Sequence, residues 1–356
     1  MSDNSGKILK SIRPGRIVWP IAIGFAVTGY LLYKEFDPSV LSTLSFTAQS
    51  LFWFFISFVM MAIRDMGYMM RIRLLTNNQL SWRQTFNTIM LWEFTSAITP
   101  SAIGGTSVAI FFLNKEGIKI GRSTAVVMVT SFLDELYFII TFPLIILLIG
   151  RTDIFAFGDS MVEGLPWYQN QFFLFAFIGY LVKLAYTLLI SYGLFINPRG
   201  LKWLLLWVFK LPIIRKWRPQ ANESGSDLIS TSREFKNWPF KNWLKGFIAT
   251  AISWTARYWI VNTLILAFFG IHLLDWDDHI LIFGKQLVMW IMMLVSPTPG
   301  GSGFAEWVFK EFLSHFIPAG TGVAMAFAWR LVSYYPYLVI GAVVVPRWIR
   351  KHFINR

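Results

Sequence analysis

The stretch Pro297-Thr298-Pro299-Gly300-Gly301-Ser302-Gly303 interrupts a long apolar segment that extends from about residue 280 to residue 316. A second stretch, Thr99-Pro100-Ser101-Ala102-Ile103-Gly104-Gly105, interrupts the apolar segment between about 86 and 113 in the same way. Proline and clustered glycines break helices. Unwound backbone persists inside a bilayer only where protein or a polar cavity satisfies its N–H and C=O groups. The two stretches therefore predict two pairs of half-helices that meet at a polar site.

Apolar runs long enough to cross a bilayer surround both interruptions. Hydrophobic residues make up 55% of the 356-residue chain and charged residues only 14%, whereas soluble domains have about 25% charged residues. This composition excludes an ordinary soluble enzyme and a disordered chain. The absence of cysteine excludes disulfides, thiolate metal sites and cysteine nucleophiles. We expect membrane spans over residues 17–36, 50–70, 123–149, 172–195, 244–269 and 323–345.

The basic residues predict the orientation of these spans. The segments placed on one side hold 24 of the 32 Lys and Arg residues, whereas the loops on the other side hold only Lys34 and Arg151. Since cytoplasmic loops carry the excess of basic residues, both termini are expected in the cytoplasm, as in a multi-pass protein of the bacterial inner membrane. The net charge of +13 then reflects cytoplasmic loops, and no nucleic-acid partner is expected.

The two halves of the chain predict an inverted repeat. Residues 50–149 and 244–345 each read as a span, a broken segment and a second span, but the first unit begins outside and the second inside. The expected fold class is an all-α polytopic membrane protein with an inverted-topology repeat and two re-entrant, Pro/Gly-broken half-helix pairs. Residues 1–356 form one integral membrane domain. Such paired interruptions mark the binding sites of transporters.

A basic segment over residues 197–245 follows the connecting span 172–195. Its first part, about 201–211, has the pattern of an interfacial amphipathic helix. Its centre, 220–232, is polar and reads as a flexible linker. Because ten Lys and Arg residues lie in this cytoplasmic loop, we expect it to bind anionic lipid headgroups.

Two motifs of the second half resemble a known family. The run from Pro297 to Gly303 is followed three residues later by Glu306, and Arg330-Leu331-Val332 precedes Tyr334-Tyr335. Both are similar to motifs of the lysylphosphatidylglycerol synthase transmembrane-domain family, also called flippase-like, and the resemblance covers about 17–350. It implies movement of a phospholipid or a polyprenyl-linked glycolipid between leaflets. The founding member's C-terminal aminoacyltransferase domain has no counterpart, so synthesis of the lysyl-lipid is not expected.

Charged residues inside apolar spans are costly and point to function by default. For Arg257 and Arg330 we weigh phosphate binding, which suits the forked guanidinium, against structural ion pairs. For Arg64 the structural ion pair is favoured. Glu306 and Glu93 are expected to cap a helix, pair with an arginine or bind a cationic headgroup.

Three further intramembrane charges lie on the spans between the two broken segments. Of the neighbours Asp134 and Glu135, one carboxylate is expected to pair with an arginine, and the other could carry a proton. Lys183 is expected to reach the membrane surface. The candidate substrate-binding residues of the whole chain are Arg64, Glu93, Thr99, Pro100, Gly104, Gly105, Asp134, Glu135, Arg257, Thr298, Pro299, Gly300, Gly301, Ser302, Gly303, Glu306 and Arg330.

The leading hypothesis is a lipid translocator that is not an enzyme and uses no metal or cofactor. No G-x-x-x-x-G-K-[ST] loop is present for nucleotide-driven pumping. Two alternatives remain open, namely a membrane transferase acting on a lipid phosphate and a non-transporting partner of a lipid-modifying enzyme. The expected partner is a membrane phospholipid or a polyprenyl lipid, and a homodimer is a further option.

Overall fold

The computed structural model describes residues 47–98, 104–150, 154–155, 171–208, 210, 215, 218–270, 274–293, 301 and 303–354. Within these ranges the regular structure is helical and no strand occurs, which confirms the expected all-α class. The predicted first span over 17–36 lies outside the described residues. So do the centres of both interruptions, 99–103 and 294–300.

Among the described residues, four segments are long and apolar enough to cross a membrane, as in a multi-pass membrane protein. They are Ala48–Leu75, Ile120–Ile149, Phe173–Ile196 and Gly322–His352. The first two are helices α3 and α6, and the third comprises most of α7 (Gln171–Ser191) and the π-helical turn Tyr192–Ile196.

The span expected over 244–269 is present as helix α10 (Phe240–Phe269), which is 30 residues long. Arg257 and Asn262 interrupt the apolar half of α10. Its composition therefore does not mark it as a span in the way that it marks the other four, and that α10 crosses the bilayer stays a prediction.

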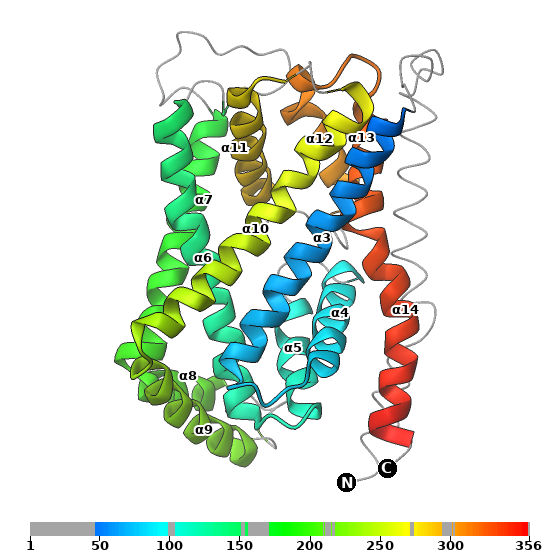
Figure 1. The fold of residues 1–356 in the computed structure, drawn as a ribbon. Coiled ribbons are helices and arrows are strands. Elements are labelled where there is room, and N and C mark those ends of the chain that lie inside the picture. The colour runs from blue at the N-terminus through cyan, green and yellow to red at the C-terminus, as the bar shows by residue number, and fades with distance from the viewer. Residues whose placement is uncertain are drawn as a thin grey trace.

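The broken segments form pairs of short helices. In the first half these are α4 (Trp82–Ile98) and α5 (Gly104–Lys115), and in the second half α11 (Trp276–Met293) and α12 (Phe304–Phe312). Figure 1 shows α4 and α5 in the lower half of the molecule and α11 and α12 in the upper half. This arrangement is the one expected of inverted halves. That each pair enters and leaves the bilayer on one side stays a prediction.

Helices α3 and α10, the first helix of each half, lie side by side (Figure 1). Gly67 permits their close approach, since a Cβ atom there would collide with Ser253 Oγ and lie 2.8 Å from the carbonyl oxygen of Ala249. Ser253 Oγ in turn donates a hydrogen bond to the carbonyl oxygen of Arg64 at 2.9 Å. Small residues commonly allow such contacts between membrane helices.

The last span differs from the single helix expected over 323–345. It consists of α13 (Gly322–Ser333) and α14 (Tyr335–Ile349), separated at Tyr334, whose φ and ψ are −128° and −55°. Pro336 lies at the start of α14 and has no N–H for the hydrogen bonds that would continue α13. The helix is therefore interrupted at Tyr334, within the span Gly322–His352.

The prediction of a flexible linker over 220–232 is wrong. Helix α9 (Arg218–Lys236) occupies this segment and packs against α6 and against α8 (Pro198–Val208), the amphipathic helix expected near 201–211. Gly121 of α6 allows close contact, because a Cβ atom there would collide with the Ser224 carbonyl. Small or apolar residues recur at positions 221, 225, 228, 232 and 235 of α9. This spacing puts them on one face, which outweighs the polar composition.

Candidate functional site

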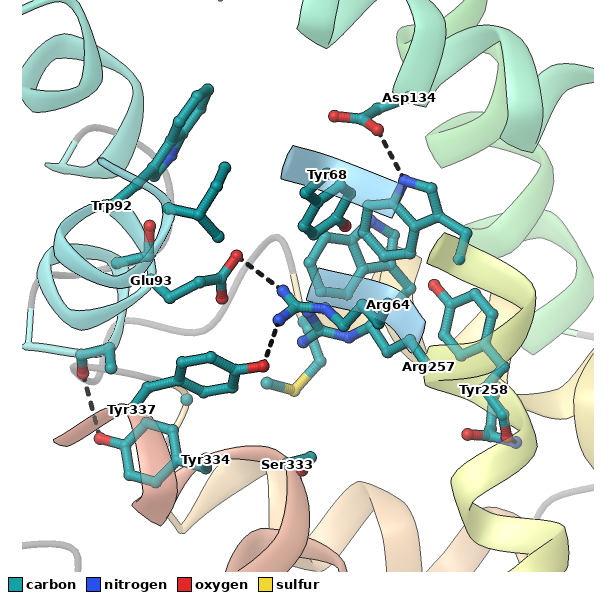
Figure 2. Close-up of a pocket in the computed structure, with 18 of the residues that line it drawn as sticks. Arg64, Tyr68, Trp92, Glu93, Asp134, Arg257, Tyr258, Ser333, Tyr334 and Tyr337 are labelled. Carbon is teal, nitrogen blue, oxygen red and sulfur yellow. Dashed lines mark hydrogen bonds and ion pairs between the residues drawn. The ribbon is translucent and has the colours of Figure 1, made fainter. Parts of the chain in front are cut away.

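A cavity of about 350 Å³ lies between helices of the two halves. Residues from α3, α4, α6, α10, α11, α13 and α14 line it. Its charged lining residues are Arg64, Arg71, Glu93, Asp134, Arg257 and Arg330. Figure 2 shows Arg64, Glu93 and Tyr337 pointing towards one another from three helices. Five of the six charged residues were predicted from the sequence, and the structure brings them to one place.

Arg64 is the most completely paired of the four arginines. Its Nη1 donates to Tyr337 Oη at 2.7 Å and to Asp65 Oδ1 at 3.0 Å, and its Nη2 lies 2.6 Å from Glu93 Oε1. The Tyr337 hydroxyl also lies 2.9 Å from both Asp65 oxygens. The side chain of Arg64 is buried, so these bonds offset its loss of hydration. The predicted ion pair is present, with two carboxylates instead of one.

Arg71 was not among the predicted site residues, because it read as part of the basic flank of a span. It is buried and donates two hydrogen bonds to Asp134, at 2.5 and 3.2 Å, and one to Thr250 Oγ1 at 2.9 Å. Trp254 Nε1 also donates to Asp134 Oδ1 at 2.7 Å. The available signal was its spacing, since Arg71 follows Arg64 by seven residues and shares its helix face.

Arg330 and Glu306 form a buried pair at the second broken segment. Arg330 Nε donates to Glu306 Oε1 at 2.9 Å, and both side chains are at most 6% exposed. Glu306 Oε2 accepts a hydrogen bond from the backbone N–H of Gly303 at 2.7 Å. Helix capping and arginine pairing were alternatives for Glu306, and the structure shows both. Gly303 has a φ of +82°, a conformation that glycine adopts without strain.

The glycines of the two interruptions are only partly described. Gly301 lines the cavity, whereas Gly104 and Gly105 begin α5. A Cβ atom on Gly105 would collide with Ser96 Oγ, so this glycine serves close packing of α4 and α5. The remaining predicted residues of these stretches lie outside the described residues: Thr99, Pro100, Thr298, Pro299, Gly300 and Ser302.

Arg257 differs from the other three arginines. Within the described part of the chain it has no carboxylate partner, and its nearest recorded neighbours are aromatic rings. Its Cζ lies 5.5 Å from the ring centroid of Trp254 and 5.3 Å from that of Trp290. A guanidinium over ring faces is held in place while its N–H groups remain available to an anion.

Glu135 and Lys183 form an ion pair that is separate from the lining of the cavity. Lys183 Nζ lies 2.8 and 2.7 Å from the two oxygens of Glu135, and Lys183 is buried. The prediction that Lys183 reaches the membrane surface is therefore wrong. Consecutive residues of a helix point about 100° apart, which explains why Asp134 faces the cavity and Glu135 faces α7.

The charge balance of the site follows from these pairs. Asp65 and Glu306 lie outside the cavity lining and neutralise Arg64 and Arg330, whereas Glu93 and Asp134 line the cavity themselves. Arg257 is the lining arginine without a carboxylate among the described residues. No group of three His, Cys, Asp or Glu residues in these ranges could hold a metal ion. The arrangement can bind an anion beside aromatic rings.

Comparison with known proteins relates the chain to membrane proteins. The model of the lysylphosphatidylglycerol synthase TM region matches residues 17–341. A UPF0104 membrane protein of Archaeoglobus fulgidus is 26% identical over 288 residues, which cover 78% of this chain and 80% of that protein. No solved structure matches.

Proposed function

The chain belongs to the lysylphosphatidylglycerol synthase transmembrane-region family, and from this premise we propose that it moves a phosphate-bearing lipid between the two leaflets of a membrane. The protein acts as a translocator and not as an enzyme. Its substrate is a phospholipid or a polyprenyl-linked lipid, and its location is the bacterial inner membrane, with both termini in the cytoplasm.

The observation that carries this proposal is that Arg257 lines the cavity without a neutralising carboxylate among the described residues. It is a cation in a cavity that lies between helices of the two halves. Five buried polar atoms of lining residues have no hydrogen-bond partner within the described ranges: Arg64 Nε, Arg71 Nε, Thr130 Oγ1, Tyr258 Oη and Arg330 Nη2. Buried polar atoms normally have partners, so these partnerless atoms support a site whose ligand is an anion such as a phosphate.

The size of the cavity supports entry of a headgroup alone. Its volume of about 350 Å³ is at the lower end of the roughly 300–1,000 Å³ that small-molecule sites occupy. The acyl or prenyl chains therefore remain in the bilayer while the headgroup passes between the helices. The guanidinium of Arg257 offsets the cost of taking a phosphate out of water, and movement of one half against the other alternates access.

The test is a headgroup-flipping assay with purified protein in liposomes. Lipids with a fluorescent headgroup or short chain are incorporated, and a membrane-impermeant quencher reports the fraction that reaches the outer leaflet. Arg257→Ala removes charge-assisted hydrogen bonds worth about 1.5–3 kcal/mol, so the rate should fall by about ten- to a hundred-fold. Arg257→Lys keeps the charge and should retain part of the rate.

The matched control is Arg233→Ala, because Arg233 is exposed on α9 and remote from the lining residues. Its rate should equal that of the wild type. A wild-type rate in a folded Arg257→Ala variant would remove Arg257 from the site. Failure of the wild-type protein to flip any phosphate-bearing lipid would contradict the proposed function itself.

The alternatives were a transferase acting on a lipid phosphate and a non-transporting partner of a lipid-modifying enzyme. No contact among the described residues favours either. Chemical turnover of a radiolabelled lipid by the purified protein would support the transferase. Formation of a homodimer stays a prediction and does not enter the mechanism.

A further inference from the structure

Two neighbouring helices at one end of the molecule have different exposed faces. Figure 1 shows α8 and α9 together at the lower end, beyond the long helices. On α8 the exposed side chains include Trp203, Leu204 and Trp207, which are 65%, 46% and 56% exposed. On α9 the exposed residues other than Pro219 are polar, and no large apolar residue in its described part is exposed. Of the two helices, therefore, only α8 presents an apolar face outward.

The contacts of α8 fix which face points outward. Leu201 packs on Gly193, where a Cβ atom would lie 2.7 Å from Leu201 Cγ. Lys202 packs on Gly225 of α9 and donates a hydrogen bond to Ser226 Oγ at 2.8 Å. These two neighbours hold the opposite side of α8 against the rest of the protein. The tryptophan face is thus a permanent feature of the folded chain and cannot turn inward without breaking both contacts.

Exposed basic residues flank the tryptophans along the sequence. Arg199, Trp203, Trp207 and Lys210 follow one another at intervals of four, four and three residues, and all four are exposed. The spacing of the first three puts them on one side of α8. Lys210 lies two residues beyond the end of α8, in a turn where its backbone N–H donates to the carbonyl oxygen of Trp207 at 3.0 Å. Tryptophan is enriched at the membrane–water interface. Lys and Arg beside an apolar face are typical of helices that lie on anionic bilayers.

We propose that α8 lies in the interface of the adjacent leaflet, with Trp203 and Trp207 inserted between the lipids and Arg199 and Lys210 bound to anionic phospholipid headgroups. The neighbouring face of α9 remains in water. This surface is independent of the arginine-lined cavity, because none of its residues lines that cavity. Its test therefore does not depend on lipid translocation.

The cysteine-free sequence permits a direct test with single labels. Trp203→Cys and Leu204→Cys, each carrying an environment-sensitive fluorophore, report on α8, and Asn222→Cys reports on the exposed side of α9 as the matched control. The full chain is reconstituted in phosphatidylcholine vesicles with or without phosphatidylglycerol. Aqueous iodide and spin-labelled lipid serve as the two quenchers.

The expected result is quenching of both α8 labels by the spin-labelled lipid and several-fold weaker quenching by iodide than at Asn222→Cys. Phosphatidylglycerol should increase the protection of the α8 labels from iodide, and Arg199→Gln with Lys210→Gln should abolish that increase. Equal iodide quenching at all three positions would overturn the membrane contact. Protection that is indifferent to phosphatidylglycerol and to both substitutions would overturn the binding of anionic headgroups.

Discussion

At the scale of single residues, Arg64 and Arg257 differ in the number of carboxylates that they contact. Arg64 contacts both Asp65 and Glu93, whereas Arg257 contacts neither an Asp nor a Glu in the described part of the chain. One carboxylate neutralises a buried arginine, so the second one, Glu93, leaves negative charge at the cavity wall. Glu93 is 21% exposed and lines the cavity. It therefore repels the phosphate that we propose Arg257 binds.

Glu93→Gln should raise the affinity for a phosphate-bearing headgroup. At an effective dielectric constant near 20, a unit charge at a separation of about 5 Å contributes about 3 kcal/mol, which sets the scale of the repulsion that Glu93→Gln would remove. We expect the mole fraction of lipid at half-maximal flipping rate to fall at least about tenfold. Glu223→Gln, an exposed site on α9, should leave it unchanged. Unaltered or weaker affinity in folded Glu93→Gln protein would contradict the repulsion.

Arg330→Met should destabilise the protein strongly, because it leaves Glu306 buried without its arginine. Breaking a buried ion pair on one side costs about 3–5 kcal/mol, whereas replacing both partners is often nearly neutral. The double variant Arg330→Met with Glu306→Gln should therefore recover most of the loss. The midpoint of thermal unfolding in detergent measures both. A double variant no more stable than Arg330→Met would show that the ion pair is not the cause.

The sequence predicts a contact of the site when the two partner residues are close in the sequence, but not when they are far apart in it. The capping role of Glu306 follows from its position three residues after Gly303, which is local information. The pairing of Lys183 with Glu135, 48 residues away, depends on how α7 packs against α6. Sequence spacing holds no information on that contact. For the same reason Arg71 reads as a basic flank until α6 supplies Asp134.

At the scale of elements, α9 is the clearest difference between sequence and structure. Its polar composition is typical of a linker, yet tertiary contacts with α6 and α8 stabilise the helix. Arg122 of α6 donates hydrogen bonds to both oxygens of Glu234 at 2.9 and 3.0 Å, and Asn77 donates another at 2.7 Å. Composition describes a segment alone, and the partners that order this one come from α6 and the end of α3.

The attachment of α9 should weaken in acid. Partial burial raises the pKa of Glu234, but the hydrogen bonds from Arg122 and Asn77 and the charge of Arg122 lower it by more, so the pKa lies below its ordinary value. A lowered folded-state pKa stabilises the fold above the unfolded value of about 4.3. This contribution is lost as the pH falls through the folded value.

Thermal unfolding of the wild type and of Glu234→Gln over a series of pH values measures this loss. The wild type should unfold at the higher temperature near neutral pH, and the difference should shrink in acid because both side chains are then uncharged. Glu223→Gln, at an exposed position of the same helix, should differ little from the wild type at any pH. A difference between wild type and Glu234→Gln that does not depend on pH would contradict the role of the charge.

At the scale of the whole molecule, the inverted halves were predicted from two broken segments and the distribution of basic residues. The all-α class and the placement of the helix pairs in opposite halves of the molecule agree with that prediction (Figure 1). The break at Tyr334 was not predicted. The segment is one continuous apolar run, so its composition does not indicate a break. The only local signal is Pro336, which is compatible with the first turn of a new helix.

The orientation is testable with the cysteine-free chain. Trp276 lies at the start of α11 and is 67% exposed, and Ser230 lies on the exposed side of α9. Each residue is replaced by cysteine in a separate variant. Because basic residues concentrate at the α9 end, a membrane-impermeant maleimide should label Trp276→Cys in intact cells. It should label Ser230→Cys only after the cells are permeabilised. The reverse pattern would invert the proposed topology.

The close contact of α3 and α10 at Gly67 is the natural pivot for the proposed movement of one half against the other. Arg64 lies three residues from it, or about 4.5 Å along the axis, whereas the far end of α3 at Ala48 lies about 28 Å away. A rotation of about 10° around this point would displace Arg64 by less than about 1 Å and Ala48 by about 5 Å. On α10, Arg257 lies four residues from Ser253, so it too is close to this contact. In the proposed movement of the two halves, a pivot at this contact would therefore displace the ends of α3 and α10 most and the arginines beside the contact least.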